Sequence, residues 1–316
     1  MRSKTTLEFA NPEDGSIRKL LSELIRLALA ETVPSTRETM LRQIGLLTNK
    51  FLPSEDTKEV VSMMRDLVSG LLDTTVFSEN AVRILFWEAK GLILRLSHTD
   101  EVLERLLELL PHPEHGPASA RGFGLLLASD EILSKENGAK VRLLAKQKVY
   151  NVCIPAIAKK FRTANTVIKA NYLIALSGIL RNMPTDIIMP EIETLLPLLL
   201  QTLDLEDNDV KAATIQSLTV VGQESPMAVE GHMGSLLSRL LQSVASPKVN
   251  TASVRHNALR CLRIFPGKVK DSIVLPYKNK VIRGLLGVLD DPRRHVRKEA
   301  VECRAAWFNM DEPQSD

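Results

Sequence analysis

Apolar residues recur along most of the chain at intervals of three and four positions, which is the period of an amphipathic α-helix. No stretch shows sustained alternation of apolar and polar residues, as a half-buried strand would. We therefore predict an all-α protein. The predicted helices span 17–31, 36–51, 56–72, 79–97, 99–110, 117–129, 139–161, 165–181, 186–203, 208–222, 228–245, 252–265, 271–290 and 293–308.

Several helix boundaries follow from capping and proline chemistry. Ser35 and Glu38 have the spacing of a capping box, in which both side chains bond free backbone N–H groups at a helix start. Asp291 followed by Pro292 predicts a helix N-cap with proline at the first helical position. Proline cannot continue the helical hydrogen-bond ladder. Three prolines are therefore each predicted to end a helix: Pro184, Pro226 and Pro266.

An internal repeat dominates the second half of the sequence. Four segments align, and their first residues lie 42, 44 and 42 positions apart. They are IKANYLIALSGIL, VKAATIQSLTVV, VRHNALRCLRIF and VRKEAVECRAAW, which begin at Ile168, Val210, Val254 and Val296. Each is preceded by another leucine-rich helix. A period of this length with two helices per repeat is typical of HEAT and armadillo proteins.

The aligned segments share an order of residue types. A base follows the first residue: Lys169, Lys211, Arg255 and Arg297. An aliphatic residue stands five positions after the first: Leu173, Ile215, Leu259 and Val301. A small residue stands seven positions after it: Ala175, Ser217, Cys261 and Cys303. Eight positions after it, leucine is replaced by Arg304 in the last segment, which suits either a solvent-exposed cap or a partner contact.

These patterns predict an α-solenoid of the HEAT/armadillo type with about six to seven helical hairpins. One hairpin cannot bury both of its faces, so each gains its core by stacking on the next. We predict a flexible N-terminal arm over 1–16, a single solenoid over 17–310 and a C-terminal tail over 311–316. The clearest repeats are 140–184, 185–226, 227–267 and 268–310.

Composition narrows the possible environments and partners. The net charge of +3 is too small to indicate a nucleic-acid-binding protein. No apolar run reaches the ~18 residues that cross a bilayer, and the polar N-terminal residues lack the apolar centre of a signal peptide. Three widely spaced cysteines without a CxxC pair fit a reducing compartment: Cys153, Cys261 and Cys303.

Candidate metal ligands are few. An iron–sulfur cluster needs about four thiolates grouped in space, whereas Cys261 and Cys303 occupy the small position of successive repeats. We therefore predict that both pack in the core. His112 and His115 have HxxH spacing in a predicted loop, but zinc needs three or four ligands and no matching pair is present. We predict that the chain binds no metal and no cofactor.

Catalytic motifs are also absent from the sequence. It contains no GxSxG, no GxxxxGK[ST] and no HExxH. Gly122 and Gly124 form a GxG inside a predicted helix, where chance or close helix packing explains them. We therefore predict that the chain is not an enzyme.

The run from Leu275 to Phe308 is more specific than a general HEAT pattern. It resembles the closing repeat of the methyl-methanesulfonate-sensitivity scaffold, the large HEAT subunit of the cytosolic iron–sulfur cluster targeting complex. The resembling stretches are LPY (275–277), KVIR (280–283), LDD (289–291), VRKEAV (296–301) and WF (307–308). Upstream, AKGLILRLSH (89–98), RGFGLLLASD (121–130) and ANYLIALSGILRNMP (170–184) also resemble that family.

This resemblance implies a non-enzymatic adaptor in the cytoplasm and nucleus. Proteins of the family hold a small bridging subunit, which in turn holds a WD-repeat subunit, and their C-terminal repeats dock the bridging subunit. They recruit apo client proteins for iron–sulfur cluster insertion, including DNA polymerases, helicases and primase. Because the family's proteins are much longer, we expect this chain to be a C-terminal portion of such a scaffold.

The last predicted hairpin carries the candidate binding site. Arg293, Arg297 and Arg304 share one side of the last helix within roughly 40°, at 100° per residue. Arg294 and Lys298 flank them, and Trp307 would supply an aromatic anchor. The preceding helix could extend this patch with Tyr277, Lys278, Lys280 and Arg283.

Two interpretations of this patch remain open. A solvated helix face with weak ion pairs explains the charges without any partner, and a protein-docking patch explains them as partner contacts. A generic HEAT adaptor and a nucleic-acid-binding HEAT module are the alternative functions. The nucleic-acid module would show binding that weakens steeply with salt.

Overall fold

The computed structural model describes residues 16–73 and 78–310, so the predicted arm and tail lie outside the described residues, apart from Ser16. Within these ranges the chain is helical and contains no strand, which confirms the all-α prediction. Its contacts divide it into two compact units, Met1–Met183 and Pro184–Asp316. The boundary falls between two predicted repeats. The predicted single solenoid over 17–310 stays a prediction, because each unit is described by itself.

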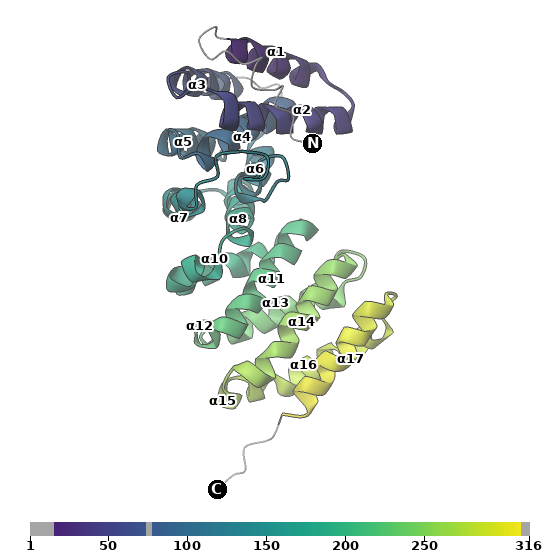
Figure 1. Cartoon of the computed structure of the whole chain (residues 1–316). Helices are drawn as coiled ribbons and strands as arrows, with labels where there is room; N and C mark the ends of the chain where they lie inside the picture. The colour runs from purple at the N-terminus through teal and green to yellow at the C-terminus, as the bar shows by residue number, and fades with distance from the viewer. Residues whose placement is uncertain (1–15, 74–77, 311–316) are drawn as a thin grey trace. The chain divides into compact units, whose positions relative to one another are not determined.

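The first unit contains four helical hairpins (Figure 1). They are α1 (Ser16–Ala30) with α2 (Pro34–Leu46), α3 (Thr57–Asp73) with α4 (Glu79–Leu94), α5 (Thr99–Glu108) with α6 (Gly116–Leu127), and α7 (Leu144–Thr163) with α8 (Thr166–Arg181). A π-helical turn, η3 (Leu47–Phe51), extends α2. The second helices of the hairpins pack on one another in chain order, and α3, α5 and α7 form the other layer.

The second unit contains three hairpins. Their first helices are α10 (Ile192–Thr202), α13 (Met233–Ala245) and α16 (Lys278–Gly284), preceded by the short helices α9 (Thr185–Ile188), η4 (Met189–Glu191), α12 (Pro226–Glu230), α15 (Asp271–Val274) and η5 (Leu275–Tyr277). Their second helices are α11 (Asn208–Glu224), α14 (Ala252–Lys268) and α17 (Arg294–Phe308), with η6 (Leu286–Asp290) leading into α17. In Figure 1 these second helices lie side by side, and α14 contacts both neighbours.

The described residues therefore form seven hairpins, within the predicted six to seven. Their second helices start where the repeat alignment expects, because polar side chains cap three of them. Asn165, Asp207 and Thr251 each accept a hydrogen bond from the backbone N–H three residues later, at the first residue of an aligned segment. Such caps satisfy backbone donors that have no partner inside the helix.

Close helix packing explains the GxG pattern. A Cβ placed on Gly178 of α8 would lie 2.8 Å from the backbone nitrogen of Gly124 in α6. Gly122 lies against the ring of Phe86 in α4 in the same way. Gly122 and Gly124 let the backbone of α6 approach α4 and α8, where a larger residue would clash.

A long loop over 128–143 folds back across the earlier hairpins of the first unit. The side chain of Asn49 bonds Lys140 twice, accepting from its backbone N–H at 2.7 Å and donating to its carbonyl at 3.0 Å. Leu133 of the loop is buried, and Lys90 of α4 donates to the carbonyl of Ala128 at 2.8 Å. The prediction of helix over 139–143 is therefore wrong, because these residues bond back to the π-helical turn instead.

Two predicted caps are also wrong. Helix α2 begins at Pro34 with Val33 as an N-cap that has no side-chain bond, so Ser35 and Glu38 do not form a capping box. Arg293, not Asp291, is the N-cap position of α17. Asp291 is buried and paired with Arg255, and its carboxylate also accepts a hydrogen bond of 2.8 Å from the backbone N–H of Arg293.

Proline positions differ from the prediction in two respects. Helix α14 runs through Pro266 to Lys268, because a proline so close to the helix end costs few hydrogen bonds. The predicted helices 186–203 and 271–290 are each interrupted by a short 3₁₀ segment that contains Pro190 or Pro276. Proline lacks an N–H group, so the helical ladder breaks there.

Candidate protein-docking face

Helix α17 has a buried side and an outward side. The buried side carries Val296, Ala300, Cys303 and Trp307, all 0% exposed. The outward side, which we call the forward face, carries Arg294, Arg297, Lys298, Val301, Arg304 and Phe308. At 100° per residue these six positions fall within about 120° around the helix, with Val301 and Phe308 near the middle.

The forward face exposes positions that are buried in the earlier hairpins. Val301 is 58% exposed, whereas Ile215 of α11 and Leu259 of α14, at the same repeat position, are 0% exposed. Arg304 replaces leucines that are equally buried: Leu218 and Leu262. In α11 and α14 these positions belong to helices that have a following hairpin against them. No further hairpin follows α17 in the described residues, so its forward face is open.

Phe308 adds a large apolar side chain to this face, at 62% exposed. Val301 and Phe308 are two turns apart on the helix, so they form one apolar strip. The bases Lys298 on one side and Arg297 and Arg304 on the other frame the strip. An apolar centre with a charged rim is the general anatomy of a protein interface.

Trp307 corrects the prediction of an aromatic anchor. Its side chain is fully buried, and its ring nitrogen donates a hydrogen bond of 2.8 Å to the carbonyl of Leu262 in α14. The bond fixes α17 against α14, and no part of the ring is open to a partner. The helical pattern alone does not show which side of the last helix faces the preceding hairpin, so it does not reveal that Trp307 is buried there.

The predicted site residues before α17 do not join the forward face. Lys278 donates to the carbonyl of Met310 at 2.7 Å, and Lys280 donates to Ser238 of α13 at 2.8 Å. The hydroxyl of Tyr277 lies against Gly234 of α13. These three side chains therefore join elements within the second unit. Arg283 is exposed in the last turn of α16.

Arg293 also lies off the predicted stripe. It precedes α17 in an extended conformation, with φ of −96° and ψ of 122°, so the helical period does not apply to it. Arg294 takes its place as the first base of the forward face. The structure thus brings together four of the predicted bases: Arg294, Arg297, Lys298 and Arg304.

The acidic residues of α17 face α14 more than the forward face. Glu299 is buried and pairs with Arg263 of α14 at 3.1 Å, and Glu302 also pairs with Arg263. Lys298 lies 3.9 Å from Glu302, a weak surface pair. The forward face is therefore basic, since its four bases outnumber the single acid at its margin.

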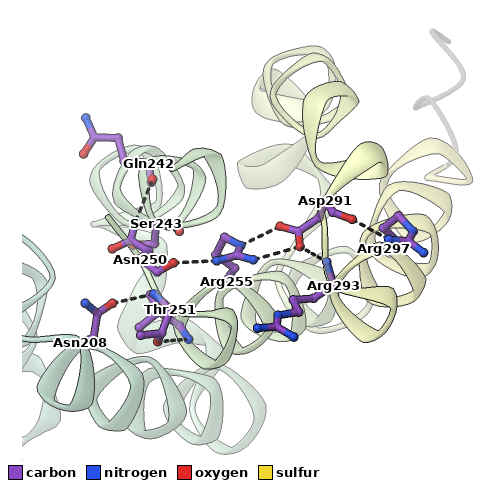
Figure 2. Close-up of polar contacts among 10 residues, drawn as sticks. Asn208, Gln242, Ser243, Asn250, Thr251, Arg255, Asp291, Arg293 and Arg297 are labelled. Atoms are coloured by element: carbon purple, nitrogen blue, oxygen red, sulfur yellow. Dashed lines mark hydrogen bonds and ion pairs between the residues drawn. The ribbon is translucent and has the colours of Figure 1, made fainter. Parts of the chain in front are cut away.

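In the second unit, a row of polar side chains connects α11 and α14 each to the turn inside the following hairpin (Figure 2). Lys211 of α11 donates to Asn250 of the next turn at 3.1 Å. Arg255 of α14 forms a two-bond fork with Asp291 of the turn after that, at 2.7 and 2.9 Å. We call this row, which ends at Arg297, the polar ladder.

The Arg255–Asp291 pair is almost completely buried, with side chains 3% and 1% exposed. Burial alone would raise the pKa of the Asp291 carboxyl. The bonds from Arg255 and from the backbone N–H of Arg293 outweigh burial, so its pKa lies below the usual value. Asp291 therefore stays charged and holds two successive hairpins together.

The cysteines and histidines do not form a site. Cys153, Cys261 and Cys303 are buried, and burial raises the pKa of each thiol, to about 12 for Cys261. The predicted core positions of Cys261 and Cys303 are confirmed. His112 and His115 stack on each other, with ring centres 4.6 Å apart. In the described ranges no three His, Cys, Asp or Glu side chains are placed to hold a metal ion.

None of the described helices combines the length and the apolar character that crossing a membrane requires. Stacked helical hairpins with an open, basic and partly apolar end face place the protein in the class of HEAT- and armadillo-type repeat proteins. Solved structures of this class share the fold. Kap121p bound to RanGTP matches 93% of this chain and 29% of its own, with a TM-score of 0.57 and 14% identity. A designed armadillo repeat protein matches 77% of this chain and 99% of its own, with a TM-score of 0.51 and 16% identity.

Sequence comparison then gives the family. The model of the family described as "RNAPII transcription regulator C-terminal", MMS19_C, matches residues 3–266, and the chain belongs to this family. The MMS19 nucleotide excision repair protein homologs of Bos taurus and Homo sapiens are 34% and 33% identical over 96% of this chain and 29% of their own length. The DNA repair/transcription protein mms19 of Schizosaccharomyces pombe is 33% identical over 92% and 29%. The predicted family resemblance is confirmed, and the chain spans about three tenths of these relatives.

Val301 and Phe308 are the members of the forward face that are not among the predicted site residues. Val301 stands at the repeated aliphatic position, which is buried in the earlier hairpins, and Phe308 belongs to the WF stretch of the family resemblance. A signal for both existed in the alignment. Positions that earlier repeats bury against a following hairpin become exposed wherever no hairpin follows.

Proposed function

We propose that the chain is a non-enzymatic scaffold whose forward face docks the small bridging subunit of the cytosolic iron–sulfur targeting complex. Through that subunit it holds the WD-repeat subunit. The scaffold recruits apo clients, including DNA polymerases, helicases and primase, for iron–sulfur cluster insertion in the cytoplasm and the nucleus.

One observation carries this proposal. Val301 and Phe308 are more than half exposed on a helix whose Val296 and Trp307 are fully buried, and bases flank them. Exposed apolar residues gathered on one face, with a polar rim, mark an interaction site. The names of the relatives support a role in DNA repair or transcription, which fits clients that act on DNA.

The same observation favours a protein partner over nucleic acid. An apolar strip gains nothing against a phosphate backbone, where binding depends on counterion release by many bases. Two large apolar side chains inside a rim of Arg and Lys instead match the centre and rim of a protein interface.

Binding of this chain to the purified bridging subunit, measured by calorimetry, tests the proposal. We expect wild-type binding, and about tenfold or greater weakening when Val301 and Phe308 are both replaced by Asp. Hot-spot truncations cost at least ~2 kcal/mol, and burying an unpaired charge adds to this loss.

The matched control is Met227→Asp with Val249→Asp. Both side chains are apolar and more exposed than or similar to the tested pair, at 71% and 60%, but they lie on other hairpins of the same unit. We expect this control to bind like the wild type. Absence of wild-type binding would refute the proposed function, and equal weakening by both variants would refute the assignment of the face.

A further inference from the structure

The polar ladder has a regular direction. In α11 and α14 the base at this repeat position reaches forward to a polar side chain in the turn of the next hairpin: Lys211 to Asn250, and Arg255 to Asp291. Each step also places the polar turn residue between two successive second helices. Figure 2 shows this alternation from Asn250 through Arg255 and Asp291 to Arg297.

Arg255 uses its guanidinium in two directions. Nη1 donates backward to the carbonyl of Asn250 at 2.6 Å, in the turn before its own helix. Nε and Nη2 donate forward to the carboxylate of Asp291. One arginine thus fixes its own turn and binds the following layer.

Arg297 occupies the same repeat position and makes the same backward bond. Its Nη1 donates to the carbonyl of Asp291 at 2.7 Å, in the turn before α17. Its Nε and Nη2 make no hydrogen bond or ion pair to any residue in the described ranges. In Arg255, which makes the same backward bond, these two donors bind a carboxylate.

We propose that Nε and Nη2 of Arg297 bind a carboxylate of the partner that docks on the forward face, as the corresponding atoms of Arg255 bind Asp291. The partner would then act as the next layer of the stack. It would cover Val301 and Phe308 with apolar side chains and place an Asp or Glu against Arg297.

The chemistry of the site favours an acidic protein partner. A guanidinium fork matches the two oxygens of a carboxylate and gives directional, charge-assisted bonds. Arg294, Lys298 and Arg304 on the same face add attraction for a negatively charged surface without fixing its register. Arg297 is half-buried, so its charge is screened less than those of the exposed Arg294 and Lys298.

This inference rests on the proposed function, and its test uses the same purified bridging subunit. We expect Arg297→Lys to weaken binding about tenfold, because lysine keeps the charge and can reach the Asp291 carbonyl but lacks the fork. Arg260→Lys is the matched control, because Arg260 is an exposed arginine of α14 outside the forward face, and we expect less than a twofold change. Thermal melting of both variants checks that the fold is kept.

A double-mutant cycle identifies the carboxylate. Each exposed Asp and Glu of the bridging subunit is changed in turn to Asn or Gln. We expect one such change to weaken wild-type binding about tenfold and to have no further effect on the Arg297→Lys chain.

The outcomes separate the two claims. If the wild-type chain does not bind the subunit, both the proposed docking function and the Arg297 assignment are refuted. The wild-type chain could bind while Arg297→Lys binds equally well, or while no acidic residue of the subunit is coupled to Arg297. Either result would refute the Arg297 assignment and leave the docking function supported. Self-association of the chain that Arg297→Lys abolishes would show that a second copy is the occupant, which would also overturn the inference.

Discussion

Arg255 and Asp291 illustrate how single residues set the register between hairpins. Removing one member of a buried ion pair typically costs about 3–5 kcal/mol, because the other charge is left buried without a partner. The pair adds less stability than that figure, since both charges lost water when they were buried. Its two-bond geometry, however, is met in only one relative position of α14 and the turn before α17. The ladder therefore specifies alignment between layers that apolar packing alone would leave less defined.

Glu88 of α4 is a buried carboxyl whose pKa is shifted in the opposite direction from that of Asp291. Burial is the cause that raises its pKa to about 8, whereas glutamate in an unfolded chain titrates near 4.3. Between these two values the folded protein binds a proton that the unfolded protein does not. The contribution of Glu88 to the free energy of unfolding therefore falls as pH rises from about 4.3 to about 8, and it is constant outside that range.

We predict that Glu88→Gln removes the part of the fall in stability with rising pH that Glu88 causes. Relative to the wild type, the variant should gain thermal stability steadily between pH 5 and pH 8, because glutamine keeps the shape but never ionises. Melting curves measured by circular dichroism at several pH values check it. Glu136→Gln, on an exposed carboxyl, is the control and should show no such gain. A constant difference between Glu88→Gln and the wild type across this range would contradict the prediction.

At the scale of elements, the spacing of second helices depends on where glycine allows close approach. The backbones of α6 and α8 meet at Gly124 and Gly178, and the atoms nearest to an added Cβ on Gly178 are backbone atoms that cannot rotate away. Side-chain contacts elsewhere could adjust to an extra methyl group, but this contact requires the helices to move apart.

We predict that Gly178→Ala destabilises the chain by about 1–2 kcal/mol. Overpacking costs about 1–3 kcal/mol, and the better helix propensity of alanine returns up to about 1 kcal/mol. Gly70→Ala in α3 is the matched control, because nothing lies within 4 Å of its added Cβ and only the propensity gain of up to about 1 kcal/mol remains. Urea unfolding measures both. Equal stabilisation by the two variants would show that α6 and α8 are not in tight contact.

At the scale of the whole molecule, each hairpin is stabilised mainly by its neighbours. In such arrays, stability is approximately a sum of repeat terms and nearest-neighbour interface terms. Within the second unit, α14 contacts both α11 and α17, whereas α11 and α17 share no close set of contacts. We therefore expect a partner on the forward face to stabilise α17 most, and to stabilise α14 less, through its contacts with α17.

We predict that the bridging subunit slows amide hydrogen exchange most in α17, less in α14 and least in α11. At a partner concentration 100-fold above Kd, binding stabilises the folded state by about 2.7 kcal/mol, which sets an upper limit of about 100-fold on the slowing. Hydrogen-exchange mass spectrometry with and without the subunit measures this gradient. Maximal slowing in α1 and α2 instead would place the docking site elsewhere.

Much of this fold was predictable from local chemistry, because helix period, caps and repeat spacing act within a few residues. The second helices of the last four hairpins begin within two residues of prediction. The site was predictable only in part. Arg294, Arg297, Lys298 and Arg304 lie together as expected, but Trp307 faces α14, and Lys278 and Lys280 bond within their own unit. These outcomes depend on which side of a helix meets its neighbour, and both sides of α17 carry apolar residues.

The sequence by itself determined the all-α class, the forty-odd-residue repeat, the small residues at close helix contacts and the family. Each of these depends on the order and spacing of residue types along the chain. Only the tertiary structure decided that Asp291 pairs with Arg255, that the loop over 128–143 folds back onto the π-helical turn, and that Val301 and Phe308 are exposed. The physical reason is that exposure and pairing belong to the neighbours that a residue meets in space. The repeats place similar residue types at several equivalent positions, and the presence of a following layer decides whether those positions are buried or exposed.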